Sequence, residues 1–317
     1  MNPLSRAVHG ECLAGGTALG IRGTRALGRL HAWGRRGGVK SAFLLRSAGR
    51  LAMFLAVAGL ALLHAGWLSL TERHAPSHTR RARWLRRWCR TVLPFIGVEV
   101  EQHGRAPDGG MLVCNHVSYL DMPALATATE MIFLSKAEVR RWPLLGAIAR
   151  AGGTLFVNRE RRADVADLGP QFASVICEGV VLTMFPEGTS TGGDRVLPFH
   201  SSLLAPAAEH GWPVTPASIS YEVADGVVEQ DVAYWRDMTF VPHFLKLLGK
   251  ARVRAVVQFG EPQRNPDRKA LARGLHRAVI ALNRPPAGNF KPLAWQAECP
   301  SSRTPEPKLE QPGRKLT

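Results

Sequence analysis

The sequence predicts an α/β domain that follows a membrane-inserted helix and an interfacial amphipathic helix. Past residue 97, short runs rich in β-branched residues alternate with helical stretches, which is typical of an α/β layered fold. Ahead of them lie a long uncharged segment and a segment with tryptophan and arginine at helical spacing. We therefore expect four parts along the chain: a basic flexible leader (1–40), membrane-associated helices (41–96), the α/β domain (97–283) and a disordered tail (284–317).

Positive charge is concentrated at the front of the chain. Residues 1–100 hold sixteen Lys and Arg but three acidic residues, within a net charge of +16 for all 317 residues. Such a segment favours an anionic surface, either lipid headgroups or nucleic acid. The five cysteines lie far apart without paired spacing, which argues against a disulfide scaffold or a zinc site and favours a reducing compartment.

The uncharged segment runs from Leu51 to Leu70, and its twenty residues could cross a hydrocarbon core of ~30 Å as a helix. A full span and a shallow hairpin are both open, and arginines on both sides give no firm orientation. A buried core helix is the alternative, but cores seldom need so many uncharged residues in a row. The segment therefore predicts membrane insertion.

A second helix is predicted over Arg80–Ile96. Its tryptophans and aliphatic residues recur at helical spacing, while four arginines fill the other face: Arg83, Arg86, Arg87 and Arg90. Such a helix suits a membrane interface, with tryptophans at headgroup depth and guanidinium groups on lipid phosphates. A solvated helix packed on the domain is the alternative. No nucleic-acid-binding module is visible, so a nucleic-acid partner is not expected.

The α/β domain is predicted to contain seven strands, at Val98–Gln102, Met111–Cys114, Met131–Leu134, Thr154–Val157, Val180–Phe185, Val214–Ile219 and Arg252–Phe259. Helices are expected between them, for example at Ala163–Glu178 and Asp267–Leu282. Seven prolines in the last 33 residues indicate a disordered tail.

The first candidate site is formed by His116 and Asp121, just after the predicted strand 111–114. On one continuous helix these residues would point about 140° apart. They can meet only if His116 lies on the strand-to-helix turn and Asp121 opens the helix, which Pro123 supports because proline is tolerated in a first turn. We expect one carboxylate oxygen to cap the helix and the other to accept the imidazole N–H, which leaves a competent general base. A plain N-cap beside a loop histidine is the alternative.

Two further strand ends carry polar groups. The run Phe185–Ser190 offers a carboxylate, a glycine and two hydroxyls, in a turn whose backbone amides could hold a phosphate. A tight turn with Gly188 at positive φ is the alternative. Arg159 follows the strand 154–157 and could grip a phosphate through two parallel hydrogen bonds, although a single strand-end arginine is more often a solvated surface residue.

Together these blocks resemble the glycerolipid acyltransferases of the PlsC type, the 1-acyl-sn-glycerol-3-phosphate acyltransferases. The resemblance covers residues 80–283 and rests on four blocks in order: His116-x4-Asp121, Val157–Arg159, Phe185–Thr189 and Val214–Pro216. It implies a mixed-sheet acyltransferase domain in which His116 deprotonates the acceptor hydroxyl and Asp121 orients it. It also implies, without metal or cofactor, an acceptor-binding set of Arg159, Glu187, Gly188 and Thr189.

The implied reaction moves a fatty acyl group from acyl-ACP or acyl-CoA, as co-substrate, to the hydroxyl of a lysophospholipid without a covalent enzyme intermediate. The commonest acceptor in the family is 1-acyl-glycerol-3-phosphate, which we expect here. One departure matters: many members carry an arginine shortly after Glu-Gly-Thr, whereas no basic residue occurs here before Arg195. The run Arg195–Phe199 looks like the branch that acylates lyso-ornithine lipid, and that acceptor is the alternative.

Two readings of other classes are open. Residues 188–192 fit the G-x-S-x-G pattern of serine hydrolases, with Ser190 as nucleophile, but that elbow needs a helix directly after it, where Gly193 and Pro198 stand instead. The second alternative function is a non-enzymatic membrane-binding module. For the acyltransferase we expect the cell (inner) membrane, with the active site facing the cytoplasm, where acyl thioesters are available. Its partners are then membrane lipids and acyl carrier protein or a CoA thioester.

Overall fold

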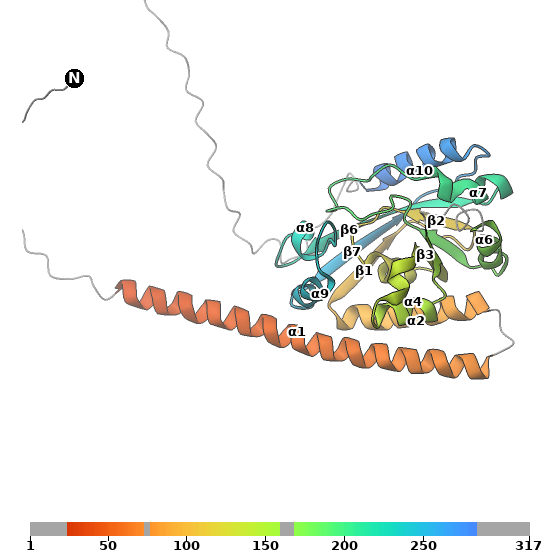
Figure 1. Ribbon diagram of the computed structural model, residues 1–317. Coiled ribbons are helices and arrows are strands. Elements are labelled where there is room, and N and C mark those ends of the chain that lie inside the picture. The colour runs from red at the N-terminus through yellow and green to blue at the C-terminus, as the bar shows by residue number, and fades with distance from the viewer. Residues whose placement is uncertain (1–23, 73–76, 159–167, 284–317) are drawn as a thin grey trace, which may run out of the picture. The chain divides into compact units, whose positions relative to one another are not determined.

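A seven-stranded sheet forms the centre of the domain (Figure 1). The computed structural model describes residues 24–72, 77–158 and 168–283. The strands are β1 (Val98–His103), β2 (Met111–Cys114), β3 (Met131–Lys136), β4 (Leu155–Val157), β5 (Val181–Met184), β6 (Val214–Val223) and β7 (Val253–Phe259).

The sheet is mixed, as the resemblance implies. Its strand order is β1-β7-β6-β2-β5-β3-β4. Neighbours pair in parallel except for β6 and β7, which are antiparallel. Strands β1 and β7 therefore run opposite to the other five. The carboxyl ends of β2, β3 and β5 lie at one edge, where we expect a site in a sheet of this kind.

All seven predicted strands are present. The central strands β2 and β5 are buried at every position, and their short apolar sequences suit parallel strands covered on both faces. The largest difference is in β6, which continues four residues past the predicted end to Val223. This extension pairs with β7 and carries residues that reach the active site.

Helices cover both faces of the sheet. They are α1 (Thr24–Thr71), α2 (Ser77–Phe95), α3 (Asp121–Ala126), η1 (Ala137–Arg141), α4 (Leu145–Ala151), α6 (Leu168–Cys177), η2 (Ser201–Leu204), α7 (Ala205–His210), α8 (Val228–Asp231), α9 (Phe240–Leu248) and α10 (Arg268–Leu282). One buried apolar cluster joins the sheet to α2, α3 and α9, and a second joins it to α6, α7 and α10. Figure 1 shows α7 and α10 on the face of the sheet opposite α2 and α9.

The two helices predicted in the domain are found. Helix α10 matches the prediction at 267–282, and Asp267 caps it by accepting a hydrogen bond from the Lys269 amide at 2.8 Å. Helix α6 falls within the prediction at 163–178, of which residues 163–167 lie outside the described residues. The predicted tail at 284–317 lies outside them as well.

Helix α1 contains the whole uncharged segment 51–70. Within the described parts of the chain, residues 41–71 form the one helix that is long and apolar enough to cross a membrane. The helix also includes residues 24–40, which the sequence assigned to a flexible leader. The chain divides into two compact units, Met1–Leu44 and Leu45–Thr317, and every contact described below lies within the second.

Helix α2 packs its aromatic side against α1 and part of its basic side against the domain. Trp84 is 3% exposed, and its indole N–H donates to an α1 carbonyl oxygen at 2.9 Å. Arg86 and Arg90 donate to the carbonyl oxygens that end α3, at 2.9 and 2.8 Å. The expectation that Trp84 lies at headgroup depth is therefore wrong, whereas headgroup contact by the half-buried Arg86 and the exposed Arg90 stays a prediction. Helical spacing identifies two faces of a helix but not what covers each face.

Candidate active site

His116 and Asp121 meet where β2 passes into α3. Strand β2 ends two residues before His116, and Asp121 is the first residue of α3, which confirms the predicted strand-to-helix turn. The imidazole Nδ1 lies 2.7 Å from Asp121 Oδ2. Because a carboxylate accepts this hydrogen bond, the tautomer with its proton on Nδ1 is favoured and Nε2 keeps its lone pair. His116 is partly exposed toward a cavity, whereas Asp121 is fully buried.

The Asp121 carboxylate holds the whole turn. Its Oδ2 also accepts hydrogen bonds from the amides of Val117 and Ser118 at 2.7 and 3.0 Å. Its Oδ1 accepts from the Tyr221 hydroxyl at 2.6 Å. The expectation that one oxygen caps the helix while the other takes the imidazole is therefore wrong. One oxygen serves both the imidazole and the preceding loop, and the other is bound by β6.

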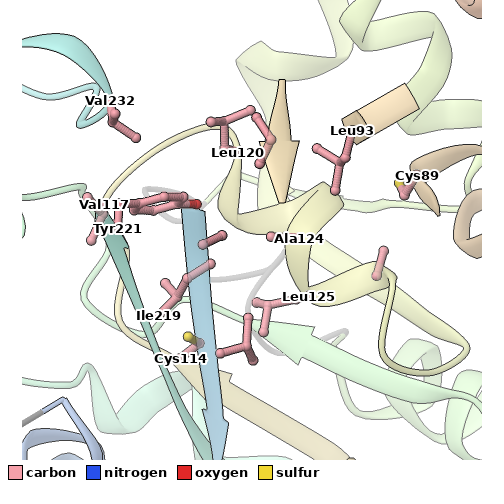
Figure 2. Close-up of a cluster of buried hydrophobic side chains, with 14 of the residues drawn as sticks. Cys89, Leu93, Cys114, Val117, Leu120, Ala124, Leu125, Ile219, Tyr221 and Val232 are labelled. Atoms are coloured by element: carbon pink, nitrogen blue, oxygen red, sulfur yellow. The ribbon is translucent and has the colours of Figure 1, made fainter. Parts of the chain in front are cut away.

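Tyr221 belongs to the buried cluster that underlies the turn. Figure 2 shows it with Val117 and Leu120 from the turn, Ala124 and Leu125 from α3, and Ile219 from β6. Burial raises the pKa of Tyr221 well above its usual value, and the charge of Asp121 raises it further. The hydroxyl therefore stays protonated and acts as a donor to the carboxylate.

The backbone around His116 is fixed on three sides. Asn115 makes two hydrogen bonds to the backbone of Ile219, at 2.9 and 2.8 Å, which join the turn to β6. The amide of His116 donates to Glu187 Oε1 at 2.8 Å, and its carbonyl accepts from the Thr191 amide at 2.9 Å. The ring stacks on Phe185 with centroids 4.3 Å apart. These contacts leave the imidazole little freedom to change orientation.

Glu187, predicted to bind the acceptor, faces backbone amides. Besides His116, it accepts a hydrogen bond from the Leu197 amide at 2.9 Å, so both oxygens are occupied, and the residue is 4% exposed. Burial raises the pKa of Glu187 to about 7, and the two amide hydrogen bonds oppose this shift. The contacts describe a residue that positions the loop; acceptor binding by Glu187 stays a prediction.

The structure describes two of the other three residues predicted to bind the acceptor, Gly188 and Thr189. Gly188 has φ of +78° and so forms the tight turn considered as the alternative, and it also lines the cavity together with Thr189. Arg159 lies outside the described residues. Ser190, the hydrolase candidate, donates its hydroxyl to the Tyr234 carbonyl oxygen, and residues 191–200 contain no helix. The elbow that a serine hydrolase requires is therefore absent at this position.

An apolar cavity of about 390 Å³ adjoins His116. Its walls come from α1, α2, α4, α9 and the strand ends, and include Phe54, Trp88, Leu145, Phe240 and Phe244. This volume falls in the range of ligand pockets, roughly 300–1,000 Å³. An apolar cavity lined in part by a general base suits a fatty acyl chain whose reactive end meets the histidine.

Lys136 is a functional candidate that the sequence did not reveal. It ends β3 and is exposed, and among the described residues it is the one Lys or Arg that lines the cavity. The available signal in the sequence was a lysine at the end of a strand, but the pairing of that strand end, where Lys136 lies opposite Val157 of β4, is visible only in the sheet. No group of three or more His, Cys, Asp or Glu in the described residues is arranged to hold a metal ion.

The comparisons with known proteins agree with this geometry. A family model described as Acyltransferase matches residues 97–220. The chain is 40% identical to a lyso-ornithine lipid O-acyltransferase of Pseudomonas aeruginosa, over 73% of this chain and 90% of the relative. It is 32% identical to a 1-acyl-sn-glycerol-3-phosphate acyltransferase of Neisseria gonorrhoeae, over 40% of this chain and 50% of the relative.

A solved structure shares the fold. The crystal structure of the 1-acyl-sn-glycerophosphate (LPA) acyltransferase PlsC from Thermotoga maritima matches with a TM-score of 0.55 at 19% identity, covering 78% of this chain and 98% of that one. The resemblance inferred from the four sequence blocks is confirmed. The chain belongs to the acyltransferase family and is an O-acyltransferase with a mixed α/β fold.

Proposed function

We propose that this enzyme transfers a fatty acyl group from an acyl thioester to the hydroxyl of lyso-ornithine lipid. The observation that carries the proposal is the set of four relatives named lyso-ornithine lipid O-acyltransferase, which are 31–40% identical and matched over 72–94% of their lengths. The 1-acyl-sn-glycerol-3-phosphate acyltransferase of Neisseria gonorrhoeae is matched over half its length. This acceptor replaces the lysophosphatidate that the sequence blocks alone favoured.

The turn after Thr189 supports the same acceptor. Ser190 and Thr191 stand there, and both hydroxyls are engaged with backbone carbonyl oxygens. Neither can neutralise a phosphate dianion, which requires cationic or multiple N–H donors. An ornithine headgroup carries a carboxylate and an amine in place of the phosphate, so it needs less positive charge. Lys136 at the cavity edge supplies one ammonium group for the carboxylate.

The proposed mechanism is a direct attack. The acceptor hydroxyl loses its proton to His116 Nε2 as its oxygen attacks the thioester carbon, so that an ester C–O bond forms and the C–S bond breaks. The proton then passes from the imidazolium to the departing thiolate. Asp121 stabilises the imidazolium through the 2.7 Å contact with Nδ1. A thioester is reactive enough that no enzyme nucleophile is needed.

We propose acyl carrier protein or CoA as the thiol of the donor, and the apolar cavity as the site of the acyl chain. We also propose residence at the inner membrane with the active site on the cytoplasmic side. Two sets of contacts with the catalytic domain and α2 support insertion of the segment 45–71 into one leaflet. Arg46 and Arg50 near its start bind carbonyl oxygens at residues 248–251, and Trp84 binds the Ala61 carbonyl oxygen in its second half.

One assay tests the acceptor. Purified full-length enzyme receives one acyl donor and equal amounts of lyso-ornithine lipid and lysophosphatidate, and the products are separated by mass spectrometry. We expect diacylated ornithine lipid as the main product. Phosphatidate as the main product would reverse the assignment and leave the roles of His116 and Asp121 unchanged. Repeating the assay with acyl-ACP and acyl-CoA identifies the donor.

A further inference from the structure

Helix α9 has an exposed apolar face that the reaction does not explain. Its buried side carries His243, Phe244, Leu247 and Leu248. Its other side exposes Val241 at 63% and Leu245 at 36%, which stand one turn apart on the same stripe. Outside α1 and α2, Val227 is the one other large apolar side chain exposed in the described residues. We call Val241, Pro242 and Leu245 the α9 face.

Helix α9 is bound to the start of the candidate membrane segment of α1. Ser47 donates a hydrogen bond to the Leu245 carbonyl oxygen at 3.3 Å. Arg46 and Arg50 donate to the carbonyl oxygens of Gly249 and Leu248 at 3.0 and 3.1 Å. These bonds hold the end of α9 against the first turns of the candidate membrane segment, so the α9 face and the exposed leucines of α1 belong to two helices that are in contact.

Charge around the α9 face favours a lipid leaflet as its occupant. Lys246 is half-exposed and Arg46 partly exposed beside it, and both pair with aspartates, Asp231 and Asp225. Cations bordering an apolar surface are typical of the boundary between acyl chains and phosphate headgroups. The family's membrane association provides the adjoining apolar phase. We propose that the α9 face contacts the acyl chains of the same leaflet that holds α1.

This contact would place lipid on one side of α9 and substrate on the other. Phe240 and Phe244 of the same helix line the cavity, and the Phe244 ring packs 5.0 Å from Phe54 of α1. A single helix of nine residues then separates the bilayer from the substrate cavity. The inference rests on the proposed membrane residence, and the experiment is designed to separate the two.

The test uses one fluorophore at three alternative positions of the full-length enzyme. In a background with Cys12, Cys177 and Cys299 replaced by serine, a single cysteine is introduced by Leu60→Cys on α1, Val241→Cys on α9, or Ala281→Cys on α10. The labelled proteins are mixed with phosphatidylglycerol vesicles whose acyl chains carry bromine, a contact quencher. Position 60 reports membrane residence alone, and position 281 is the matched exposed control on the other face of the sheet.

We expect quenching at positions 60 and 241 and none at position 281. Quenching at 60 with position 241 as bright as 281 would overturn the proposal while membrane residence stands. A change at 241 that depends on protein concentration and not on bromine would indicate contact with a second copy, and would also overturn it. Absence of quenching at positions 60 and 241 would contradict both inferences.

A second variant checks the result without a label. Val241→Asp places a carboxylate on the α9 face, and Ala281→Asp places the same group on α10. Because a charge is costly in the hydrocarbon region, we expect severalfold weaker co-sedimentation of Val241→Asp with vesicles and unchanged co-sedimentation of the control. Equal binding of the two variants, both with wild-type circular dichroism, would contradict the proposal.

Discussion

The Tyr221 hydroxyl and the Asp121 carboxylate are joined by a hydrogen bond of 2.6 Å across 100 residues of sequence. It connects the extended part of β6 to the first residue of α3, and it holds the carboxylate that orients His116. Tyr221 does not touch the cavity, so its effect on the reaction passes through Asp121.

Tyr221→Phe should lower the free energy of unfolding by about 1.5–3 kcal/mol, because a hydrogen bond to a buried charged group is lost. The remaining carboxylate, with one donor fewer, holds the imidazolium more strongly, so the acidic limb of the pH–rate profile should move to higher pH. Tyr119→Phe is the comparison variant, since it removes a cavity-lining hydroxyl that contacts His243 and not Asp121. A profile identical in both variants would show that Tyr221 is only structural.

His116→Ala should reduce kcat by about 10²–10⁴-fold, since the general base is lost. The fold should survive, because the imidazole is partly exposed and its backbone contacts are retained. Turnover and thermal unfolding are measured on the same preparation. Near-wild-type turnover in a folded variant would contradict the mechanism.

Asp121→Asn should lose most activity as well, but with a different signature. The carboxylate accepts four hydrogen bonds, from the imidazole, two amides and the Tyr221 hydroxyl. An amide has one acceptor oxygen and cannot satisfy four donors. We therefore expect a clear drop in the unfolding midpoint of Asp121→Asn, in contrast to His116→Ala. Equal midpoints would show that the carboxylate does not hold the turn.

Lys136→Ala should raise the acceptor KM about ten- to a hundredfold with a smaller change in kcat. A charge-assisted hydrogen bond of about 1.5–3 kcal/mol to the headgroup is removed. Arg140→Ala is the control, because Arg140 is exposed on the adjacent η1 and does not line the cavity. Arg159→Ala is expected to act in the same way as Lys136→Ala. If Lys136→Ala and Arg140→Ala have the same KM, Lys136 does not bind the headgroup.

Glu187 should make stability depend on pH. Burial raises its pKa from 4.5 to about 7, so the folded state binds the proton more tightly than the unfolded state. Its contribution is complete below pH 4.5 and is lost as pH rises through 7, by at most about 3 kcal/mol. Denaturant unfolding between pH 4.5 and 8 should show this slope in the wild type and not in Glu187→Gln. Parallel curves for the two proteins would show that Glu187 does not titrate in this range.

Much of the sheet could be predicted because short apolar runs report strands directly. The order of those strands could not, since it depends on contacts such as the one between Asn115 and Ile219, 104 residues apart. The same limit hid Lys136, whose position beside the cavity depends on the pairing of β3 with both β4 and β5.

The candidate site was located by residue type and spacing, but atomic roles depend on neighbours from other strands. His116 and Asp121 meet as predicted, whereas the second oxygen of Asp121 is bound by Tyr221. Glu187 was expected to face the acceptor, and its oxygens meet two amides. Helical periodicity correctly placed Trp84 on the apolar face of α2. It did not show that this face packs against α1 instead of lipid headgroups.

The contacts of Arg50 also impose an order on the assembly of the protein. Its guanidinium binds the end of α9, 198 residues later in the sequence. At a synthesis rate of ~5–20 residues per second, α1 leaves the ribosome roughly 10–40 s before its partner exists. During that interval α2 packs on one side of α1 but leaves several leucines of α1 exposed, and the bilayer is the apolar phase available to cover them. The nascent chain would then be recruited to the membrane first, and the catalytic domain would close onto a helix already in place.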